Sequence, residues 1–95
     1  MTTTNETRDA DASQRQRSAA QIQAWLVAYL AVALKLDRAE IDVGKTFEAY
    51  GLDSAAAVGM TGDLEEWLGY EIDPALPYDH PTIADLAQRL AEAER

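Results

Sequence analysis

The stretch YGLDSAAAV, residues 50–58, marks the place where a loop gives way to a helix. Gly51 permits a turn there, because glycine adopts a positive φ at little cost. Asp53 and Ser54 are both favoured at helix N-termini, and the three alanines that follow have high helix propensity. We therefore predict a helix that starts at Ser54 and ends before Gly69, a residue type that commonly follows the last helical turn.

Two further long helices are expected on either side. Ser18 suits the N-cap of a helix over residues 19–36, in which apolar residues recur with helical spacing. Thr82 suits the same role before a helix over residues 83–94. No apolar–polar alternation typical of strands occurs. The predicted fold class is therefore all-α.

The segments between these helices have no helical period. Residues 37–53 are long for a connection in a small domain, and we expect a packed loop anchored by four apolar side chains: Ile41, Val43, Phe47 and Tyr50. Three prolines interrupt residues 70–81 and leave room for a short helical turn around residues 75–79. The predicted architecture is a helical bundle with three main helices and one short helix.

The helix that begins at Ser54 is expected to bury one row of side chains. That row is Val58, Thr61, Leu64 and Leu68, flanked by Met60 and Trp67. Gly59 and Gly62 lie inside the same helix, where each costs up to about 1 kcal/mol relative to alanine. Either a neighbour approaches the backbone closely at these glycines, or the helix is locally weak.

Length and charge limit the classes of function. The chain has 95 residues, no cysteine and a formal net charge of −9, which fits one small domain without disulfide or thiolate chemistry. Residues 1–17 are too polar to bury a core and are interpreted as a flexible N-terminal tail. The acidic surface excludes nucleic-acid binding, and no apolar run approaches the roughly 20 residues of a membrane-spanning helix. A monomeric cytoplasmic protein is the simplest interpretation.

Sequence signals for catalysis are weak. His80 is the only histidine, so a metal site with two histidines cannot form, and its place between Asp79 and Pro81 is typical of a turn. Ser54 is not part of a G-x-S-x-G nucleophile elbow, and no phosphate-binding glycine loop occurs. We expect no catalytic residue, no metal site and no enzymatic activity of the chain itself.

Several landmarks together resemble the acyl carrier proteins of fatty-acid and polyketide assembly lines. The first is GLDS, residues 51–54, with the serine at the start of a helix. Others are Ile41-Asp42 and Thr46-Phe47 upstream, and DHPTIADLA, residues 79–87, downstream. The resemblance covers about residues 20–94 and is strongest to the polyketide type. It assigns residues 18–95 to an acyl carrier domain with the four-helix fold of that family.

The resemblance implies that Ser54 carries 4′-phosphopantetheine, transferred from coenzyme A by a separate phosphopantetheinyl transferase. It also implies that Asp53 assists the magnesium site of that transferase. The thiol of the arm would then hold acyl groups as thioesters. From residue types alone, another interpretation stays open: Ser54 as a simple N-cap and Asp53 as a first-turn carboxylate.

The helix that begins at Ser54 is also expected to dock partner enzymes. The docking residues are predicted to be Ala55, Val58, Gly59, Asp63, Glu65 and Glu66. The implied partners are an acyl-AMP ligase or acyltransferase, which loads the arm, and a ketosynthase or condensation enzyme, which unloads it. A solvated polar face is the alternative for the acidic members of this set.

Two residues depart from the common pattern of the family. Ala55 is small where many relatives have a bulky apolar residue, and Gly59 stands where many have glutamate. The stretch is similar to carriers that accept fatty acids from acyl-adenylate-forming ligases at the start of lipopeptide or polyketide lines. A peptidyl carrier of nonribosomal synthesis and a non-carrier helical interaction module remain as alternatives, and the sequence leaves open whether the acyl chain is sheltered in the core.

Overall fold

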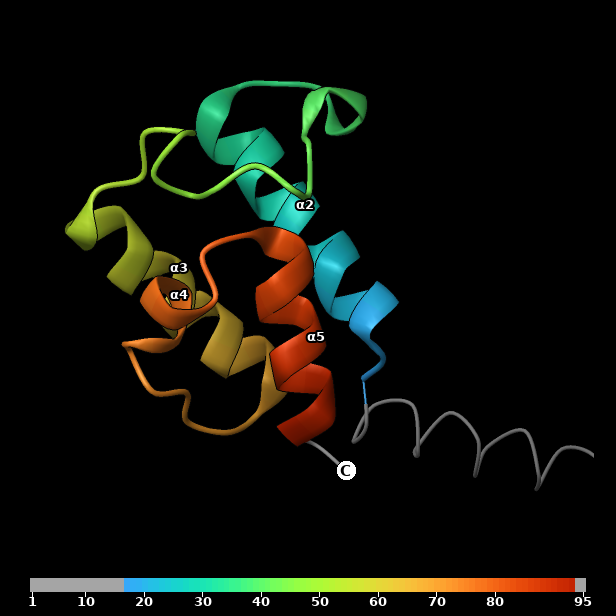
Figure 1. Ribbon diagram of the computed structural model, residues 1–95, viewed down its shortest axis with the longest axis vertical. Helices are drawn as coiled ribbons and strands as arrows, with labels where there is room; N and C mark the ends of the chain where they lie inside the picture. Colours follow the sequence, from blue (N-terminus) through green and yellow to red (C-terminus); the bar gives the residue numbers. More distant parts are fainter. Residues whose placement is uncertain (1–16, 94–95) are drawn as a thin grey trace, which may run out of the picture.

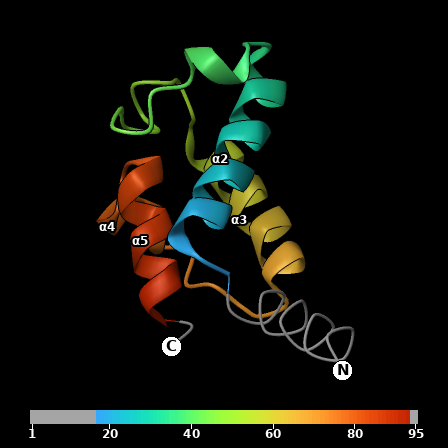
Figure 2. The same ribbon diagram turned by 90° about the vertical axis from the view of Figure 1, so that its right-hand side faces the viewer.

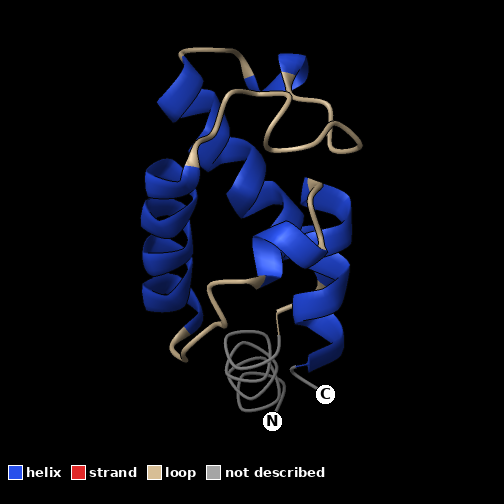
Figure 3. Cartoon of the chain, turned by 60° about the vertical axis from the view of Figure 1, so that its left-hand side comes forward, coloured by secondary structure: helices blue, strands red, loops and turns tan. Residues whose placement is uncertain are grey.

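The computed structural model describes residues 17–93 (Figure 1). Four α-helices lie in this part of the chain: α2 (Ala19–Leu34), α3 (Ser54–Leu68), α4 (Leu76–Asp79) and α5 (Ile83–Ala93). A 3₁₀ turn, η1, covers Arg38–Glu40. The described residues form no strand (Figure 3). One isolated bridge joins Thr46 and Thr82. The predicted all-α class, with three main helices and one short helix, is confirmed. The expected flexible tail lies outside the described residues, except for Arg17.

Helices α2 and α5 pack against each other and run antiparallel, and α3 completes the bundle beside them (Figures 1 and 2). The start of α2 and the end of α5 lie at the same end of the bundle, whereas α3 begins at the opposite end (Figure 2). No helix within residues 17–93 is long and apolar enough to cross a membrane.

Local capping sets the helix ends. Ser18 and Gln21 form a reciprocal capping box, in which each side chain accepts a hydrogen bond from the backbone N–H of the other residue. Gly69 ends α3 with φ +88°, as its sequence position predicts. Helix α2 ends at Leu34, two residues earlier than expected, because Lys35 adopts a left-handed conformation with φ +59°.

The core lies between α2, α3 and α5. Its largest fully buried side chains are Ile22, Leu26, Leu30, Met60, Leu64, Ile83, Leu86 and Leu90. Each main helix contributes to this set with helical spacing. The burial of these side chains supplies the main favourable term in folding.

The predicted buried row of α3 was wrong at Val58, which is 60% exposed. Ala57 and Met60 are buried in its place, together with Thr61. Residues 57, 60, 61, 64 and 68 share one face of a helix with 3.6 residues per turn, and Val58 lies about 100° around the axis from Ala57. Small residues at positions 55–57 leave the phase of the apolar stripe ambiguous in the sequence.

The loop over residues 35–53 is tied to the start of α5. Phe47 is buried, and its N–H donates to the Pro81 carbonyl at 2.8 Å. The Ala84 N–H donates to the Val43 carbonyl at 3.0 Å. This loop ends at Asp53, so the bonds that anchor it also fix the place where α3 begins.

An aromatic stack joins α2 to α3 at the outer seam of the bundle. The Trp25 ring lies between Tyr29, at a centroid distance of 5.3 Å, and Trp67, at 5.6 Å. The Arg17 guanidinium lies 4.3 Å from the centroid of Trp67 on the ring face, which is a cation–π contact. All three aromatic residues are half-buried, so this stack closes the edge of the core rather than filling its centre.

Candidate attachment site at the start of helix α3

Ser54 occupies the first turn of α3 without capping it. The cap is Asp53, whose Oδ1 accepts the Ala56 N–H at 2.8 Å. Both Asp53 and Ser54 are exposed. The interpretation of Ser54 as the N-cap therefore does not hold in the structure, and its hydroxyl is not needed to begin the helix.

The Ser54 hydroxyl instead contacts Tyr78 of α4. The Tyr78 hydroxyl donates to Ser54 Oγ at 3.1 Å, across a separation of 24 residues. Tyr78 was not among the sequence-predicted site residues. Its position in a proline-rich segment gave no sign that α4 would place it against the start of α3.

A groove of about 340 Å³ opens beside this pair. Its walls include Phe47 and Leu52 from the loop, Ala57 from α3, and Pro77 and Tyr78 from α4. The polar part of its lining consists of the hydroxyl groups of Ser54 and Tyr78 and the carboxylates of Glu48 and Asp53. Such a combination suits a long, mainly apolar substituent with a polar root.

The predicted docking residues do not form one uniform group. Ala55, Val58, Gly59 and Glu66 are exposed and follow one another along a single face of α3. Glu65 is different: its Oε2 accepts the Ile72 N–H at 2.6 Å, which ties the loop after α3 to the helix. Its carboxylate therefore has a structural partner within the chain.

Asp63, the remaining docking candidate, faces α2. Its carboxylate accepts a hydrogen bond from the Tyr29 hydroxyl. Burial raises the pKa of the Tyr29 phenol above 10.0, and the negative charge of Asp63 and this hydrogen bond raise it further. Asp63 thus helps to hold the seam between α2 and α3 while staying exposed.

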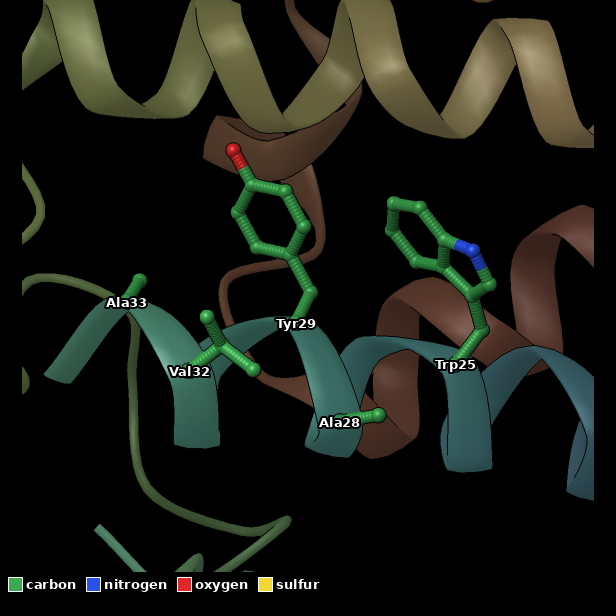
Figure 4. A pocket seen from close by; sticks show the side chains of 5 residues that line it. All are labelled: Trp25, Ala28, Tyr29, Val32 and Ala33. Carbon is green, nitrogen blue, oxygen red and sulfur yellow. The ribbon is translucent and has the colours of Figure 1, made fainter. Parts of the chain in front are cut away.

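Two apolar hollows follow the same seam. The larger, of about 490 Å³, is lined by Trp25, Ala28, Tyr29, Val32 and Ala33, and the Trp25 and Tyr29 side chains project from α2 toward α3 (Figure 4). A second hollow of about 230 Å³ shares Tyr29 and Ala33 and reaches Leu52, Ala56 and Gly59. Both hollows are partly open to solvent and therefore lie outside the buried core.

Neither glycine inside α3 is explained by a close neighbour within the described part of the chain. A Cβ placed on Gly59 or Gly62 would meet no atom within 4 Å outside the local helix backbone. The sequence offered two explanations, a close neighbour or a locally weak helix. In the isolated chain only the second is consistent with these surroundings.

The remaining polar candidates do not assemble into a second site. His80 follows α4, and its backbone N–H donates to the Leu76 carbonyl at 2.8 Å. Among residues 17–93, no group of three His, Cys, Asp or Glu side chains is arranged to hold a metal ion.

Comparison with known proteins identifies relatives over most of the chain. The sequence profile of the family described as phosphopantetheine attachment site matches residues 24–90. The acyl carrier protein TtuC of Teredinibacter turnerae is 42% identical over 74 residues, which are 78% of this chain and 85% of that protein. The solution structure of Asl1650, an acyl carrier protein from Anabaena sp. PCC 7120 with a variant phosphopantetheinylation-site sequence, superposes with a TM-score of 0.79 at 41% identity and covers 85% of this chain and 92% of that one.

Much larger proteins also contain a similar segment. One component of the phenolphthiocerol/phthiocerol polyketide synthase of Mycobacterium tuberculosis is 35% identical over 75 residues, which are 79% of this chain but 4% of that component. This match therefore covers only a small part of that component.

Proposed function

The chain belongs to the phosphopantetheine-binding family of acyl carrier domains, and from this membership we propose that Ser54 is its attachment residue for 4′-phosphopantetheine. The chain is an acyl carrier with homology to the carrier domains of polyketide synthases. The domain is proposed to extend over residues 18–95. These relationships favour a carrier over a non-carrier helical module.

The observation that carries the assignment is the exposed Ser54 hydroxyl on a helix that another residue caps. A serine needed as the N-cap could not be esterified without loss of that cap. Because Asp53 performs the capping, esterification of Ser54 leaves the start of α3 intact. The family match, residues 24–90, includes this position.

The surroundings of Ser54 fit a phosphodiester. The first backbone N–H groups of a helix have no partner within the helix, and the positive end of the helix dipole favours an anion there. The groove beside Ser54 offers apolar walls from Phe47, Leu52 and Pro77 to the pantetheine chain. Once attached, the arm supplies a thiol that holds acyl groups as thioesters, which a chain without cysteine cannot provide itself.

Attachment is a phosphoryl-group transfer between Ser54 and coenzyme A on a separate transferase. A bond forms from Ser54 Oγ to the phosphorus on the pantetheine side, and the bond from that phosphorus to the bridging oxygen breaks. The Oγ proton passes to a base, and adenosine 3′,5′-bisphosphate leaves. Asp53 is proposed to supply a carboxylate oxygen to the transferase's magnesium ion, a hard cation that prefers oxygen ligands.

Partner enzymes are proposed to dock on the exposed face of α3, formed by Ala55, Val58, Gly59 and Glu66. This face begins next to Ser54, so an enzyme bound there would lie close to the arm. The net charge of −9 would steer basic surfaces toward the carrier and favour fast, weak association. Asp63 and Glu65 contribute to this field while keeping their contacts within the chain.

The loading enzyme is proposed to be an acyl-AMP ligase or an acyltransferase, and the next enzyme a ketosynthase or condensation enzyme. The small residues Ala55 and Gly59 favour a specialised loading enzyme. Compared with many relatives, the chain lacks a bulky apolar side chain at position 55 and a charged one at position 59, which a more general partner would contact. The carrier itself is proposed to take no part in the catalysis of these steps.

Intact-mass spectrometry tests the attachment site. We expect the wild-type chain, incubated with coenzyme A and a broad-specificity phosphopantetheinyl transferase, to gain the mass of one phosphopantetheine. Ser54→Ala should gain none and should retain its helical circular dichroism, because Asp53 still caps α3. Ser18→Ala is the matched control and should be modified like the wild type. A gain that persists in Ser54→Ala would disprove the assignment.

A loading assay then tests the partner class. The modified protein is mixed with ATP, a fatty acid and a candidate acyl-AMP ligase, and in parallel with malonyl-coenzyme A and a malonyl transferase. We expect an acyl thioester in the first mixture. Loading by the malonyl transferase alone would contradict the proposed ligase partner without affecting the attachment site.

A further inference from the structure

The hydrogen bond between Tyr78 and Ser54 has no evident role in folding. Its 3.1 Å length is ordinary, but Tyr78 is 62% exposed and Ser54 is exposed as well. Both hydroxyls could bond to water instead, so a bond between them adds little to stability. A contact of this kind between α4 and the attachment residue therefore calls for another explanation.

The backbone of α4 is anchored at Tyr78, although the Tyr78 side chain is exposed. Pro77, the preceding residue, is buried. Backbone N–H groups of Tyr78 and Asp79 both donate to the Ala75 carbonyl, at 3.0 and 3.1 Å. Leu76, half-buried, packs against the core. The short helix α4 is thus anchored by the two residues before Tyr78, and the Tyr78 hydroxyl reaches Ser54 Oγ beside the groove.

We propose that Tyr78 is a positioning residue of the modification site. Its hydroxyl holds Ser54 Oγ before the arm is attached and donates to a non-bridging oxygen of the phosphodiester afterwards. This inference rests on Ser54 being the attachment residue. It assigns to α4 a recognition role toward the root of the arm, beyond the docking role assigned to α3.

The chemistry of the two states explains why the bond would persist. Before modification, Ser54 Oγ is a hydroxyl oxygen that accepts the Tyr78 proton. After modification, the same oxygen is an ester oxygen and a poorer acceptor, but the non-bridging phosphate oxygens bonded to the same phosphorus carry the charge. Hydrogen bonds to charged acceptors are about twice as strong as neutral ones. The Tyr78 bond should therefore be stronger in the modified carrier.

Nuclear magnetic resonance of tyrosine labelled with carbon-13 at the hydroxyl-bearing ring carbon tests the contact directly. The four tyrosines of the chain give few signals, and Tyr78→Phe identifies the one from Tyr78. We expect this signal to shift in unmodified Ser54→Ala, which removes the acceptor. It should shift again when the wild type is modified. The Tyr70 signal is the control, since about 21 Å of helix separates the two ends of α3, and it should not move.

Transferase kinetics test the positioning role. Tyr78→Phe keeps the ring and removes only the hydroxyl. We expect its kcat/KM for phosphopantetheinylation to fall about two- to tenfold, the range that loss of one neutral hydrogen bond gives. Tyr70→Phe should keep the wild-type value. The unfolding midpoint of Tyr78→Phe should match the wild type.

The outcomes separate this inference from the proposed function. A Tyr78 signal that is unchanged in Ser54→Ala, or a Tyr78→Phe rate equal to the wild type, would overturn the role of Tyr78 while the mass gain on Ser54 still stands. Absence of any mass gain in the wild type would instead count against Ser54 as the attachment residue. The Ser54→Ala spectrum needs no coenzyme A, so it reports on the contact in either case.

Discussion

The indole rings of Trp25 and Trp67 stack with their centroids 5.6 Å apart and their planes 19° apart, and so connect α2 to α3. The seam that they close is otherwise partly open: one apolar hollow is lined by α2, and a second extends from α2 to α3 and the loop before it. Arg17 covers the far face of the stack at Trp67. These aromatic contacts therefore add to the buried core in holding α3, the helix that bears Ser54, against α2.

Replacement of Trp67 should loosen this connection. Trp67→Leu keeps an apolar side chain but removes the stack, worth about 0.5–1.5 kcal/mol, and the Arg17 contact, worth about 0.5–1 kcal/mol. We expect the free energy of unfolding in urea to fall by about 1–2 kcal/mol. Val32→Ala, at a side chain 80% exposed on α2, should change it by less than about 0.5 kcal/mol. Equal effects of the two variants would contradict the structural role of the stack.

Asp53 has a capping role and a proposed magnesium role, and two substitutions separate them. Asp53→Ala should lower the free energy of unfolding by about 1 kcal/mol, because the Ala56 N–H loses its acceptor. Asp53→Asn keeps an oxygen that caps and should remain close to the wild type. Both variants should be modified more slowly, since neither has the carboxylate. Normal modification of Asp53→Asn would show that the transferase does not need this charge.

The glycines inside α3 should be replaceable without steric conflict. Gly59→Ala and Gly62→Ala should each raise the free energy of unfolding by up to about 1 kcal/mol, because the added Cβ meets no atom within 4 Å apart from the adjoining residues and the local helix backbone. Gly69→Ala is the control and should destabilise, since Gly69 has φ +88°. If a partner enzyme approaches the helix at Gly59, Gly59→Ala should also weaken that partner's binding, as measured by surface plasmon resonance.

The two neighbouring glutamates of α3 should respond differently to substitution. Glu65→Ala leaves the Ile72 N–H without its acceptor and should lower the free energy of unfolding by about 1–3 kcal/mol. Glu66→Ala, at an exposed position, should change stability by less than about 0.5 kcal/mol. It should instead slow association with a basic partner, an effect that disappears at high salt. A salt-independent effect of Glu66→Ala would exclude electrostatic docking at this residue.

Because the pKa of Tyr29 is raised in the folded chain, part of the free energy of unfolding is lost at alkaline pH. The phenol has an ordinary pKa of 10.0, and burial together with Asp63 raises it in the folded chain. This contribution to stability is therefore complete below about pH 10 and is lost as the pH rises through the higher pKa of the folded state. Ultraviolet absorbance of the phenolate, taken as the difference from Tyr29→Phe, measures this titration. Asp63→Asn should move the pKa of Tyr29 back toward its ordinary value, and a pKa that stays raised would assign the shift to burial alone.

Local signals made most of the fold predictable. Ser18, Gly69 and Thr82 mark helix ends because each acts on backbone groups within three or four residues, and the structure shows such bonds at all three. The early end of α2 at Lys35 could not be foreseen, since a non-glycine residue in the left-handed region has no distinct sequence signal. The burial of Met60 in place of Val58 was missed because alanines and glycines around them blur the helical phase.

Only the part of the site that depends on residues adjacent in sequence was predictable. Ser54 could be identified from the residues next to it in the sequence. Its exposure is explained by its position in the first turn of α3. Tyr78 could not, because its contact depends on how a proline-rich loop returns to the start of α3. The partners of Glu65 and Asp63 were hidden for the same reason: one lies beyond the end of the helix and the other on a different helix.

The directions in which the helices run have a consequence for how this domain would work when it is joined to other segments. The backbone enters α2 and leaves α5 at one pole of the molecule, and α3 starts at the other pole (Figure 2). Any neighbouring segment joined before residue 17 or after residue 93 thus tethers the domain from the pole remote from Ser54. The end that holds Ser54, the proposed attachment residue, can then turn toward one enzyme after another without obstruction by the tether.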